Sequence, residues 1–423
     1  MSTGRVDSVA AILSRDLLEM YFQPILSARQ RTVIGVEALA RARTAPGVVV
    51  AADVLFQMAA AEGLVEQLER RCCEKAVESF ATLPRGAHEP LLFLNLGAWI
   101  TMDDGGVGRL MGLVQASGLS SRQVAIEILE AKIDNTRKLS TIVQAFRRAG
   151  FLLVLDDVGA GHSNLDRIAL LKPDILKIDR SLIASIDSDF HKQETLKSLV
   201  GLSRRIGALV VAEGLETEAE AMVALELGAE LLQGYFVGRP KSAATVFAEV
   251  HPQDVVSIDA LARNFKAYMV KKINRRKLRH WRFNIVLNEM LCHLANSEVG
   301  QFGEALNKTI ANYPSVECIY VLDSGGAQIT ETICNPNVLH PRSGRVFRPA
   351  PKGTDHSLKE YYYILVNVEL QKYTSEPYIS FASGNLTQTI STYFRDARNN
   401  TMYVLCIDVL ADERGTVGTS QRS

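Results

Sequence analysis

The sequence of 423 residues has no excess of charge of either sign and no long apolar run. Its 47 Lys and Arg residues balance 47 Asp and Glu residues, so no overall field draws the chain to nucleic acid or to an anionic membrane. No apolar run reaches the length of about 18 residues that a membrane helix needs, and the segment MSTGRVDSVA lacks the layout of a signal peptide. We therefore expect a cytoplasmic protein with no nucleic-acid partner and no membrane partner, in which any anionic ligand is held by a local site.

Cysteine is also scarce, and its spacing fits no ligand motif. The sequence contains no CxxC pair and no Cys/His spacing of the kind that binds zinc. Because disulfides are rare in reducing compartments, we expect free thiols, without disulfides and without a zinc site. The six cysteines are Cys72, Cys73, Cys292, Cys318, Cys334 and Cys406.

What the sequence does contain, over residues 15–245, is an alternation of short apolar runs with amphipathic stretches. This pattern is typical of strand and helix units around a parallel sheet, and eight runs suffice for a closed barrel. The first two runs are joined only by SARQRT, which is too short for a crossover helix, so we expect the first strand to be antiparallel to the second. The expected strands are residues 20–26, 33–39, 91–96, 124–129, 151–156, 175–179, 208–213 and 231–236.

The chain is long enough for a second domain, and its composition changes after the barrel region. Residues 255–295 are predicted to form a helical linker, and 296–415 to form an α+β domain with hairpins around Ser324-Gly325-Gly326 and Ser383-Gly384-Asn385. The tail 416–423 is predicted to be disordered. The linker segment KKINRRKLRHWR carries seven Lys or Arg residues, which we interpret as the solvated face of a connector.

Polar residues recur at the carboxyl ends of the predicted strands. In parallel barrels these ends meet at one mouth, where catalytic residues gather. A single residue of this kind is more often a solvated turn residue, but its repetition on strand after strand predicts a common polar ring. The ring consists of Glu37, Asn95, Glu127, Asp156, Asp157, Lys177, Glu213 and Gln233.

Five carboxylates at one mouth would repel one another unless cations were present. Their oxygen ligands, with one Asn and no His or Cys, suit Mg²⁺ or Mn²⁺, and Asp156 is placed to bridge two ions about 3.5 to 4 Å apart. Such a pair activates water and clamps a phosphoryl oxygen, while Lys177 orients the attacking water or the reacting centre. We therefore predict metal-assisted hydrolysis of a phosphate ester, with Arg41 holding a phosphate that does not react.

Residues 15–245 resemble the EAL domain family of cyclic di-GMP phosphodiesterases. The likeness is carried, in the family's order, by YFQPI, EALAR, LNL, EILE, DDVGAGHSNL, LKPDILKID, VAEGLE and QGYFVGRP. It covers more than half of the chain and implies a TIM-like (β/α)8 barrel that opens cyclic di-GMP to linear pGpG with two divalent ions. No segment resembles the GGDEF motif of diguanylate cyclases.

The resemblance assigns a role to each member of the ring and to several neighbours. It implies that the metal ligands are Glu37, Asn95, Glu127, Asp156 and Asp157. The implied catalytic residues are Lys177, Glu213 and Glu37. The implied substrate-binding residues are Arg41, Gln233 and Leu39. The implied supporting residues are Glu130, Asp179 and Glu216.

One loop departs from the family pattern. The family usually has DDFGTGYSSL, whereas this chain has DDVGAGHSNL, so that Val158 and His162 replace two aromatic residues. Smaller side chains at these positions are expected to loosen the loop that holds Asp157 and the second ion. The alternative to a phosphodiesterase is therefore a receptor that binds cyclic di-GMP without cleaving it and signals to a partner.

The C-terminal region resembles, more weakly, the PAS-like or Cache-type sensor domains that accompany such enzymes. The likeness lies in YYYIL and EPYISFASGNLTQTIS, and it implies regulation by an unknown small-molecule or protein signal. Tyr361, Tyr378, Ser380 and Asp408 are candidates for a ligand pocket, or else half-buried residues of the sheet. By analogy with the family we also expect a homodimer.

Overall fold

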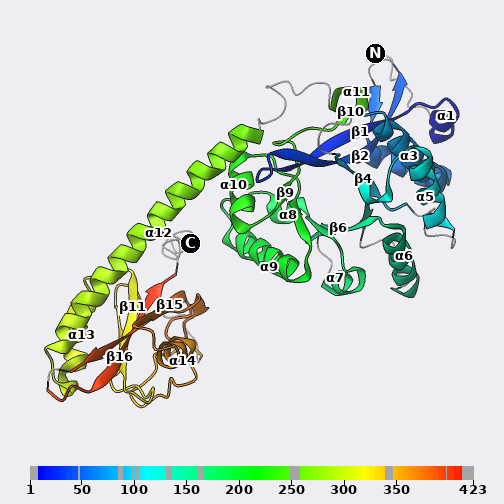
Figure 1. Ribbon diagram of the computed structural model, residues 1–423. Helices are drawn as coiled ribbons and strands as arrows, with labels where there is room; N and C mark the ends of the chain where they lie inside the picture. The colour runs from blue at the N-terminus through cyan, green and yellow to red at the C-terminus, as the bar shows by residue number, and fades with distance from the viewer. Residues whose placement is uncertain are drawn as a thin grey trace. The chain divides into compact units, whose positions relative to one another are not determined.

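The apolar runs of the first half of the chain form a closed ring of strands. The computed structural model describes residues 8–45, 48–83, 89–97, 100, 105–129, 136–160, 165–246, 258–338, 346–396 and 398–411. The chain divides into two compact units, Met1–Lys272 and Ile273–Ser423 (Figure 1). Among the described helices, none is both long enough and apolar enough to cross a membrane.

The first unit is an α/β barrel of the TIM-like type, as the sequence predicts. Neighbouring strands are parallel from β2 through β9, whereas β1 runs antiparallel to both β2 and β9 and closes the ring. The barrel strands are β1 (Leu18–Ser27), β2 (Thr32–Ala45), β4 (Leu91–Asn95), β5 (Val124–Ile128), β6 (Leu152–Val158), β7 (Ile175–Ile178), β8 (Leu209–Ala212) and β9 (Leu231–Leu232). The antiparallel first strand expected from the short SARQRT connection is confirmed.

Helices pack around the outside of the strands because each has an apolar face that the barrel wall covers. They are α1 (Val9–Ser14), α2 (Ala52–Glu62), α3 (Val65–Ala81), α5 (Gly106–Ala116), α6 (Thr136–Ala149), α7 (Leu165–Leu171), α8 (Arg180–Ile183), α9 (Phe190–Ile206), α10 (Glu218–Leu227) and α11 (Ala243–Val246), with a 3-10 turn at Ser121–Gln123. A separate apolar cluster, which includes Ile25, Phe93 and Val154, fills the inside of the barrel. The barrel is therefore a packed core that supports polar groups at one mouth, and it is not a pore.

Two details of the barrel differ from the sequence prediction. Two short strands were not predicted, β3 (Val48–Val50) beside β2 and β10 (Lys241–Ser242) beside β1. The last barrel strand was predicted as residues 231–236, but β9 ends at Leu232. The chain turns at Gly234, where φ is 151° and a Cβ atom would lie 2.2 Å from the backbone nitrogen of Leu215. This close approach requires glycine and ends the strand directly beside Gln233.

The closure between β1 and β9 is short. It consists of the single backbone pair Leu26 and Leu232. Next to it, the Gln233 side chain donates a hydrogen bond to Oε1 of Gln23 on β1 (3.4 Å), and Gln23 donates to the carbonyl oxygen of Gly238 (3.1 Å). The two strands are therefore joined largely through side-chain amides at this point.

The second unit is α+β, as predicted. Its sheet has the order β12-β11-β16-β15-β13, with β14 paired to β15. The strands are β11 (Val316–Leu322), β12 (Ile333–Cys334), β13 (Lys372–Thr374), β14 (Tyr378–Ile379), β15 (Leu386–Arg395) and β16 (Met402–Leu410). The helices are α13 (Phe302–Ile310), α14 (Glu360–Asn367) and the last part of α12 (Ile258–Ala295), with a 3-10 turn at Val299–Gln301.

The two faces of this sheet carry separate apolar clusters. One face packs against α13 and the end of α12, and the other packs against α14. The predicted hairpin at Ser383-Gly384-Asn385 joins β14 to β15. The predicted hairpin at Ser324-Gly325-Gly326 is also present, since the backbone N–H of Asp323 donates to Ala327 and that of Ile329 donates to Val321 across the turn. The returning arm bridges Leu322 at Gln328 and continues into β12, the antiparallel partner of β11. The predicted tail 416–423 lies outside the described residues.

Candidate metal centre

The ring of polar residues predicted from the sequence gathers at the barrel mouth. Glu37 lies on β2, Asn95 ends β4, and Glu127 lies on β5. Asp156 and Lys177 lie on β6 and β7, whereas Glu213 and Gln233 directly follow β8 and β9. Since successive parallel strands end at the same edge, residues far apart in the sequence meet there.

Lys177 is the centre of this arrangement. Its side chain is 2% exposed, and its Nζ lies 2.6 Å from Glu127 Oε1 and 2.6 Å from Glu213 Oε1. The same nitrogen lies 3.3 Å from Glu37 Oε2 and 3.3 Å from Asp156 Oδ1. One buried ammonium group therefore faces four carboxylates, so the cluster carries an excess of negative charge when all four are ionised.

The two amides of the ring orient two of these carboxylates. Asn95 donates to Glu127 Oε2 (3.1 Å), and Gln233 donates to Glu37 Oε2. Three buried oxygen atoms of the ring have no neutral hydrogen-bond donor within the described residues, and two of them are compensated by the Lys177 ammonium at 2.6 Å. These atoms are Glu127 Oε1, Glu213 Oε1 and Gln233 Oε1.

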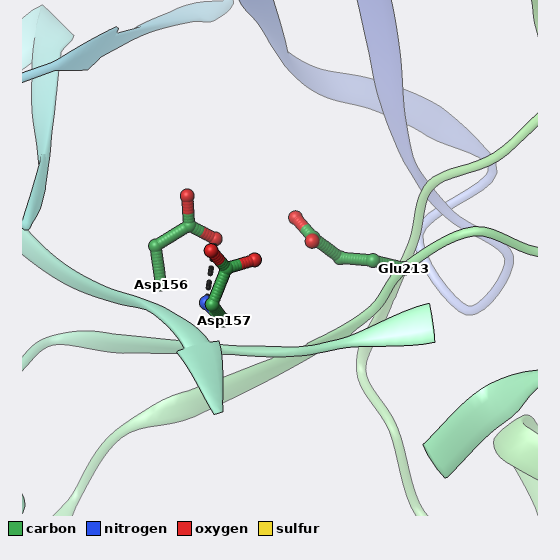
Figure 2. Close-up of side chains that lie close together, drawn as sticks. All are labelled: Asp156, Asp157 and Glu213. Carbon is green, nitrogen blue, oxygen red and sulfur yellow. Dashed lines mark hydrogen bonds between the residues drawn. The ribbon is translucent and has the colours of Figure 1, made fainter. Parts of the chain in front are cut away.

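A compact acidic cluster lies on one side of the ring. One carboxylate oxygen from each of Asp156, Asp157 and Glu213 lies within 4.8 Å of the other two. Figure 2 shows the three side chains, two from the end of β6 and one from the segment after β8, with their carboxylates turned toward a common space. The backbone N–H of Asp157 donates to Asp156 Oδ1 (3.0 Å), which fixes the first of them.

The backbone around Asp157 adopts conformations that few residues tolerate. Asp157 itself has φ of 56°, in the left-handed region. At Gly159, φ is 106° and a Cβ atom would lie 2.3 Å from Leu182 Cδ1, so a side chain does not fit there without movement. The turn that aims the Asp157 carboxylate toward Asp156 therefore depends on this local backbone.

Burial and mutual repulsion shift the ionisation of the ring. Burial raises the pKa of Glu127 well above its usual range, and the neighbouring Glu37 carboxylate raises it further. Burial is also the main cause of the raised pKa values of Asp156 and Asp157. Burial opposes the charged form of Lys177, but the attraction of the surrounding acids outweighs it and raises the Lys177 pKa.

These features fit divalent metal ions. The donors are carboxylate and amide oxygens, which suit Mg²⁺ or Mn²⁺, and the buried Gln233 Oε1 has no hydrogen-bond partner within the described residues. The excess of acidic groups and their raised pKa values both indicate that additional positive charge would be stabilising. The residues that would hold ions are those that the sequence predicted, and their assignment as ligands stays a prediction.

We expect the metal-free protein to lose stability as the pH rises. Burial raises the pKa of Glu213 from 4.5 to about 8, so the folded state retains a proton that the unfolded chain has already released. The free energy of unfolding is expected to fall by up to about 1.4 kcal/mol per pH unit for this group between these two pKa values. Thermal unfolding in the presence of a chelator, measured at intervals from pH 5 to pH 8, tests this slope.

The variant Glu213→Gln should show a shallower slope than the wild type, whereas the exposed control Glu66→Gln should not change it. Added Mg²⁺ or Mn²⁺ should restore stability at pH 8, by about 2.7 kcal/mol at a concentration of 100 times the dissociation constant. An unchanged slope in Glu213→Gln would contradict the role given to this carboxyl group.

The other predicted residues lie around the ring at different distances. Arg41 is half-buried and stacks its guanidinium over the Tyr21 ring, 5.7 Å from the ring centroid. Asp179 caps the short helix α8 by accepting from the backbone of Ser181 (2.9 Å). Glu216 is exposed and pairs with Arg180 (2.7 Å). Glu130 and His162 lie outside the described residues.

A cavity of about 250 Å³ opens beside the ring, between the barrel wall and helices α2 and α3. Leu39 and Asn95 line it on the side of the strands, and Phe56 lines it on the side of the helices. It is largely apolar with a few polar groups, which is the usual character of a site for the rings of a small ligand. Leu39, predicted to bind substrate, therefore lines this cavity together with Asn95 of the ring.

One member of the site was missed by the sequence prediction. Gln23 on β1 is buried and lies directly opposite Glu37 in the β1–β2 register. Its side chain accepts a hydrogen bond from Gln233, which also donates to Glu37. The signal was present in YFQPI, since a polar residue inside an apolar strand needs a buried partner. Its partner became evident only from the closure of the ring, which brings the end of β9 beside β1.

Comparison with known proteins supports the fold and the family of the first unit. The model of the EAL domain family matches residues 7–240. The chain is similar to the cyclic di-GMP phosphodiesterase NbdA of Pseudomonas aeruginosa, with 29% identity over 241 residues, 55% of this chain. That match covers only 30% of NbdA. The chain thus spans about a third of the length of this relative.

A second relative matches nearly the whole chain. This is the uncharacterized EAL-domain containing protein YkuI of Bacillus subtilis, which is 24% identical over 397 residues, 91% of this chain and 94% of that protein. The crystal structure of YkuI in complex with substrate c-di-GMP and calcium superposes with a TM-score of 0.76 at 23% identity, over 95% of this chain and 98% of that chain. This likeness shows that the two chains share a fold in both regions.

A second solved structure has a matching barrel and contains a transition metal. It is BlrP1 of Klebsiella pneumoniae in a manganese and cyclic di-GMP complex, with 30% identity and a TM-score of 0.50. The match covers 54% of this chain and 57% of BlrP1. These two solved relatives are thus complexes of cyclic di-GMP with calcium and with manganese, respectively.

Proposed function

The chain belongs to the EAL domain family, and from this premise we propose that it is a metal-dependent phosphodiesterase that hydrolyses cyclic di-GMP to linear pGpG. The observation that carries the proposal is the buried Lys177 among four carboxylates, beside the cluster of Asp156, Asp157 and Glu213. The name of NbdA and the cyclic di-GMP complexes of the solved relatives support the choice of substrate.

The proposed metal ligands are Glu37, Asn95, Glu127 and Asp156, with Asp157 on the second ion. When bound, two Mg²⁺ or Mn²⁺ ions would supply an activated water and a clamp for the phosphoryl oxygens. Two of these carboxylates are oriented by amide side chains, because Asn95 donates a hydrogen bond to Glu127 and Gln233 donates one to Glu37. Glu213, the third acid of the cluster, completes the metal-binding side of the site.

Lys177 has a separate task in the proposed reaction. Water attacks phosphorus in line, and the bond to the 3′ oxygen breaks, so that negative charge accumulates on the phosphoryl oxygens. The Lys177 ammonium, held by Glu127 and Glu213, remains protonated and donates to the attacking water or to these oxygens. It needs no rearrangement to do so, because its position is fixed by the acids that surround it.

The substrate would be held beside the metal centre by residues of β2. Arg41 offers its guanidinium to the phosphate that does not react, and Leu39 packs against a guanine ring that enters the neighbouring cavity. Asp179 and Glu216 would support the loops that close the site, since Asp179 caps α8 and Glu216 is tied to Arg180 on the same helix.

The C-terminal unit is proposed to regulate this activity as a PAS-like or Cache-type sensor. The support is its α+β fold and the YkuI structure, which matches nearly the whole chain in fold. Tyr361, Ser380 and Asp408 are buried in this unit, and Tyr378 donates to Asp408 (3.5 Å). The homodimer, the cytoplasmic location and the nature of the signal stay predictions from the sequence.

The proposal is tested by product chromatography. Purified protein incubated with cyclic di-GMP and Mg²⁺ or Mn²⁺ is expected to release pGpG, and a chelator is expected to stop the reaction. The variant Glu37→Ala should release no product, whereas the exposed control Glu66→Gln should behave like the wild type. If the wild type binds cyclic di-GMP but never yields pGpG, the protein is the non-catalytic receptor that the altered loop at Val158 left open.

A further inference from the structure

Two cysteines of the C-terminal unit form a cross-strand pair. Cys318 on β11 and Cys334 on β12 are register partners, and their Sγ atoms lie 2.8 Å apart. All six cysteines are free thiols in the structure. Cys318 is buried, and Cys334 is only partly covered. The pair thus combines one hidden thiol with one that a reagent in solution reaches.

The register places this pair where a disulfide fits. The backbone N–H of Asn335 donates to the Glu317 carbonyl oxygen (2.8 Å), which marks the preceding pair as hydrogen-bonded. Because such pairs alternate along an antiparallel ladder, Cys318 and Cys334 form a non-hydrogen-bonded pair, whose Cα atoms typically lie about 4.5 Å apart. This spacing falls inside the range of roughly 4.4 to 6.8 Å that disulfides require.

The short strand β12 is held in this register by the residue after the pair. The Asn335 side chain donates to the carbonyl oxygens of Ile310 (3.1 Å) and Tyr313 (3.0 Å). These bonds anchor β12 at the end of α13 independently of the cysteines. The two thiols are therefore brought together by the fold, and little movement is required to join them.

The other cysteine on this face is not an equal partner. Cys406 on β16 lies opposite Tyr320, whereas Cys318 lies opposite Asp408. Cys318 and Cys406 are therefore diagonal neighbours, which typically lie about 7 to 8 Å apart in an antiparallel pair. That separation exceeds what a disulfide spans without backbone movement.

We propose that Cys318 and Cys334 are a reversible modification site, which forms an intrachain disulfide on reaction with a small-molecule disulfide of the glutathione class. The Cys334 thiolate attacks the reagent and releases one thiolate, which gives a mixed disulfide. The Cys318 thiol then loses its proton, attacks Cys334 Sγ and releases the second thiolate. Two protein thiols are oxidised by two electrons, and one reagent disulfide is reduced to two thiols.

The order of attack follows from burial. Cys334 is the accessible thiol. The pKa of Cys318 is raised by its hydrogen bond to Cys334 and by its burial, and both disfavour the Cys318 thiolate. The product would close a loop between positions 16 residues apart and fasten the edge strand β12 to β11. This changes the sequence-based expectation of free thiols, but it requires no oxidising compartment when the bond is reversible.

Peptide mapping of the full-length native protein tests the proposal. After equilibration with oxidised glutathione and alkylation of the remaining thiols, trypsin should release the segment 309–342, which contains both cysteines and no internal Lys or Arg. Its mass is expected to be lower than the reduced form by two hydrogen atoms, without alkyl groups. Cleavage after Glu331 should leave the two halves linked until dithiothreitol is added.

Variants separate this pair from the other thiols. Cys334→Ser should abolish the linked fragment and leave Cys318 without another disulfide partner, whereas the exposed control Cys292→Ser should leave the link unchanged. Oxidation should raise the thermal midpoint of the wild type by several degrees and that of Cys334→Ser not at all. Two alkylated thiols in the wild-type segment, a glutathione adduct that never resolves, or a link to Cys406 would each overturn the proposal.

Discussion

Replacement of Lys177 by methionine is expected to lower the rate of cyclic di-GMP hydrolysis by about 100- to 1,000-fold, the loss that follows removal of one preorganised electrostatic donor. Methionine keeps the length and the apolar stem of the side chain and removes only its charged end. Because the lysine contacts carboxylates from four different strands or strand ends, its replacement removes the positive charge from all four contacts at once. Initial rates at saturating Mn²⁺ measure this loss.

The same substitution should destabilise the metal-free protein. Removal of one partner from a buried ion pair costs about 3 to 5 kcal/mol, because the remaining charge is left without compensation. Four carboxylates would lose their shared cation, so the loss in the free energy of unfolding should increase from pH 5 to pH 8 as they ionise. Metal ions should recover part of the stability but not the rate.

A matched control is Lys197→Met, since Lys197 lies on α9 with its side chain 59% exposed and forms a surface pair with Glu194. Surface pairs of this kind contribute about 0 to 1 kcal/mol. If Lys177→Met retained more than half of the wild-type rate, or if both lysine variants unfolded at the same temperature, the central role of Lys177 would be wrong.

Asp156→Asn is expected to lower the rate by more than about 100-fold, since loss of a partner that only supports a ligand already costs about 10- to 100-fold. Asp156, like Glu213, belongs to both parts of the site, because it contacts Lys177 and is a member of the acidic cluster. Asparagine preserves its shape but removes one negative charge. It should therefore impair both proposed metal positions at once.

This variant should affect stability in the opposite direction from the lysine variant. Without metal, the loss of one repelling carboxylate whose pKa is raised by burial should leave the protein at least as stable as the wild type at pH 8. With Mn²⁺, the increase in unfolding temperature seen for the wild type should be much smaller. The exposed control Asp187→Asn should retain both the rate and the metal effect. A full metal-induced shift in Asp156→Asn would contradict its assignment.

The fold of the first unit was largely predictable because apolar runs and polar strand ends are local signals. Glu127, for example, could be predicted because it lies near the end of an apolar run that forms its own strand. The partner of Gln23 was not predictable, since it depends on which strands close the ring. The end of β9 was not predicted either, because Gly234 turns the chain against the backbone of Leu215, far away in the sequence.

In the second unit the same limit applied to the cysteines. Cys318 and Cys334 carry no spacing motif, and the segment between them resembles one hairpin. The structure extends this hairpin into β12, which pairs with β11 beyond the predicted arm and brings the two thiols into register. The register of β12 is supported by contacts with α13, such as the hydrogen bond from Asn335 to Ile310. No local sequence pattern indicates such contacts.

The single backbone pair between β1 and β9 has a consequence for how mutations at the mouth are interpreted. Since Leu26 and Leu232 form the one backbone register pair between these strands, the hydrogen bonds from Gln233 to Gln23 and from Gln23 to Gly238 reinforce the junction. Gln233 also donates to Glu37, so the junction between β1 and β9 and the candidate metal centre share one side chain. A substitution at Gln233 should therefore weaken the junction between β1 and β9 and disturb the metal centre at the same time. Faster amide hydrogen exchange along β9 would report the weaker junction separately from the loss of activity.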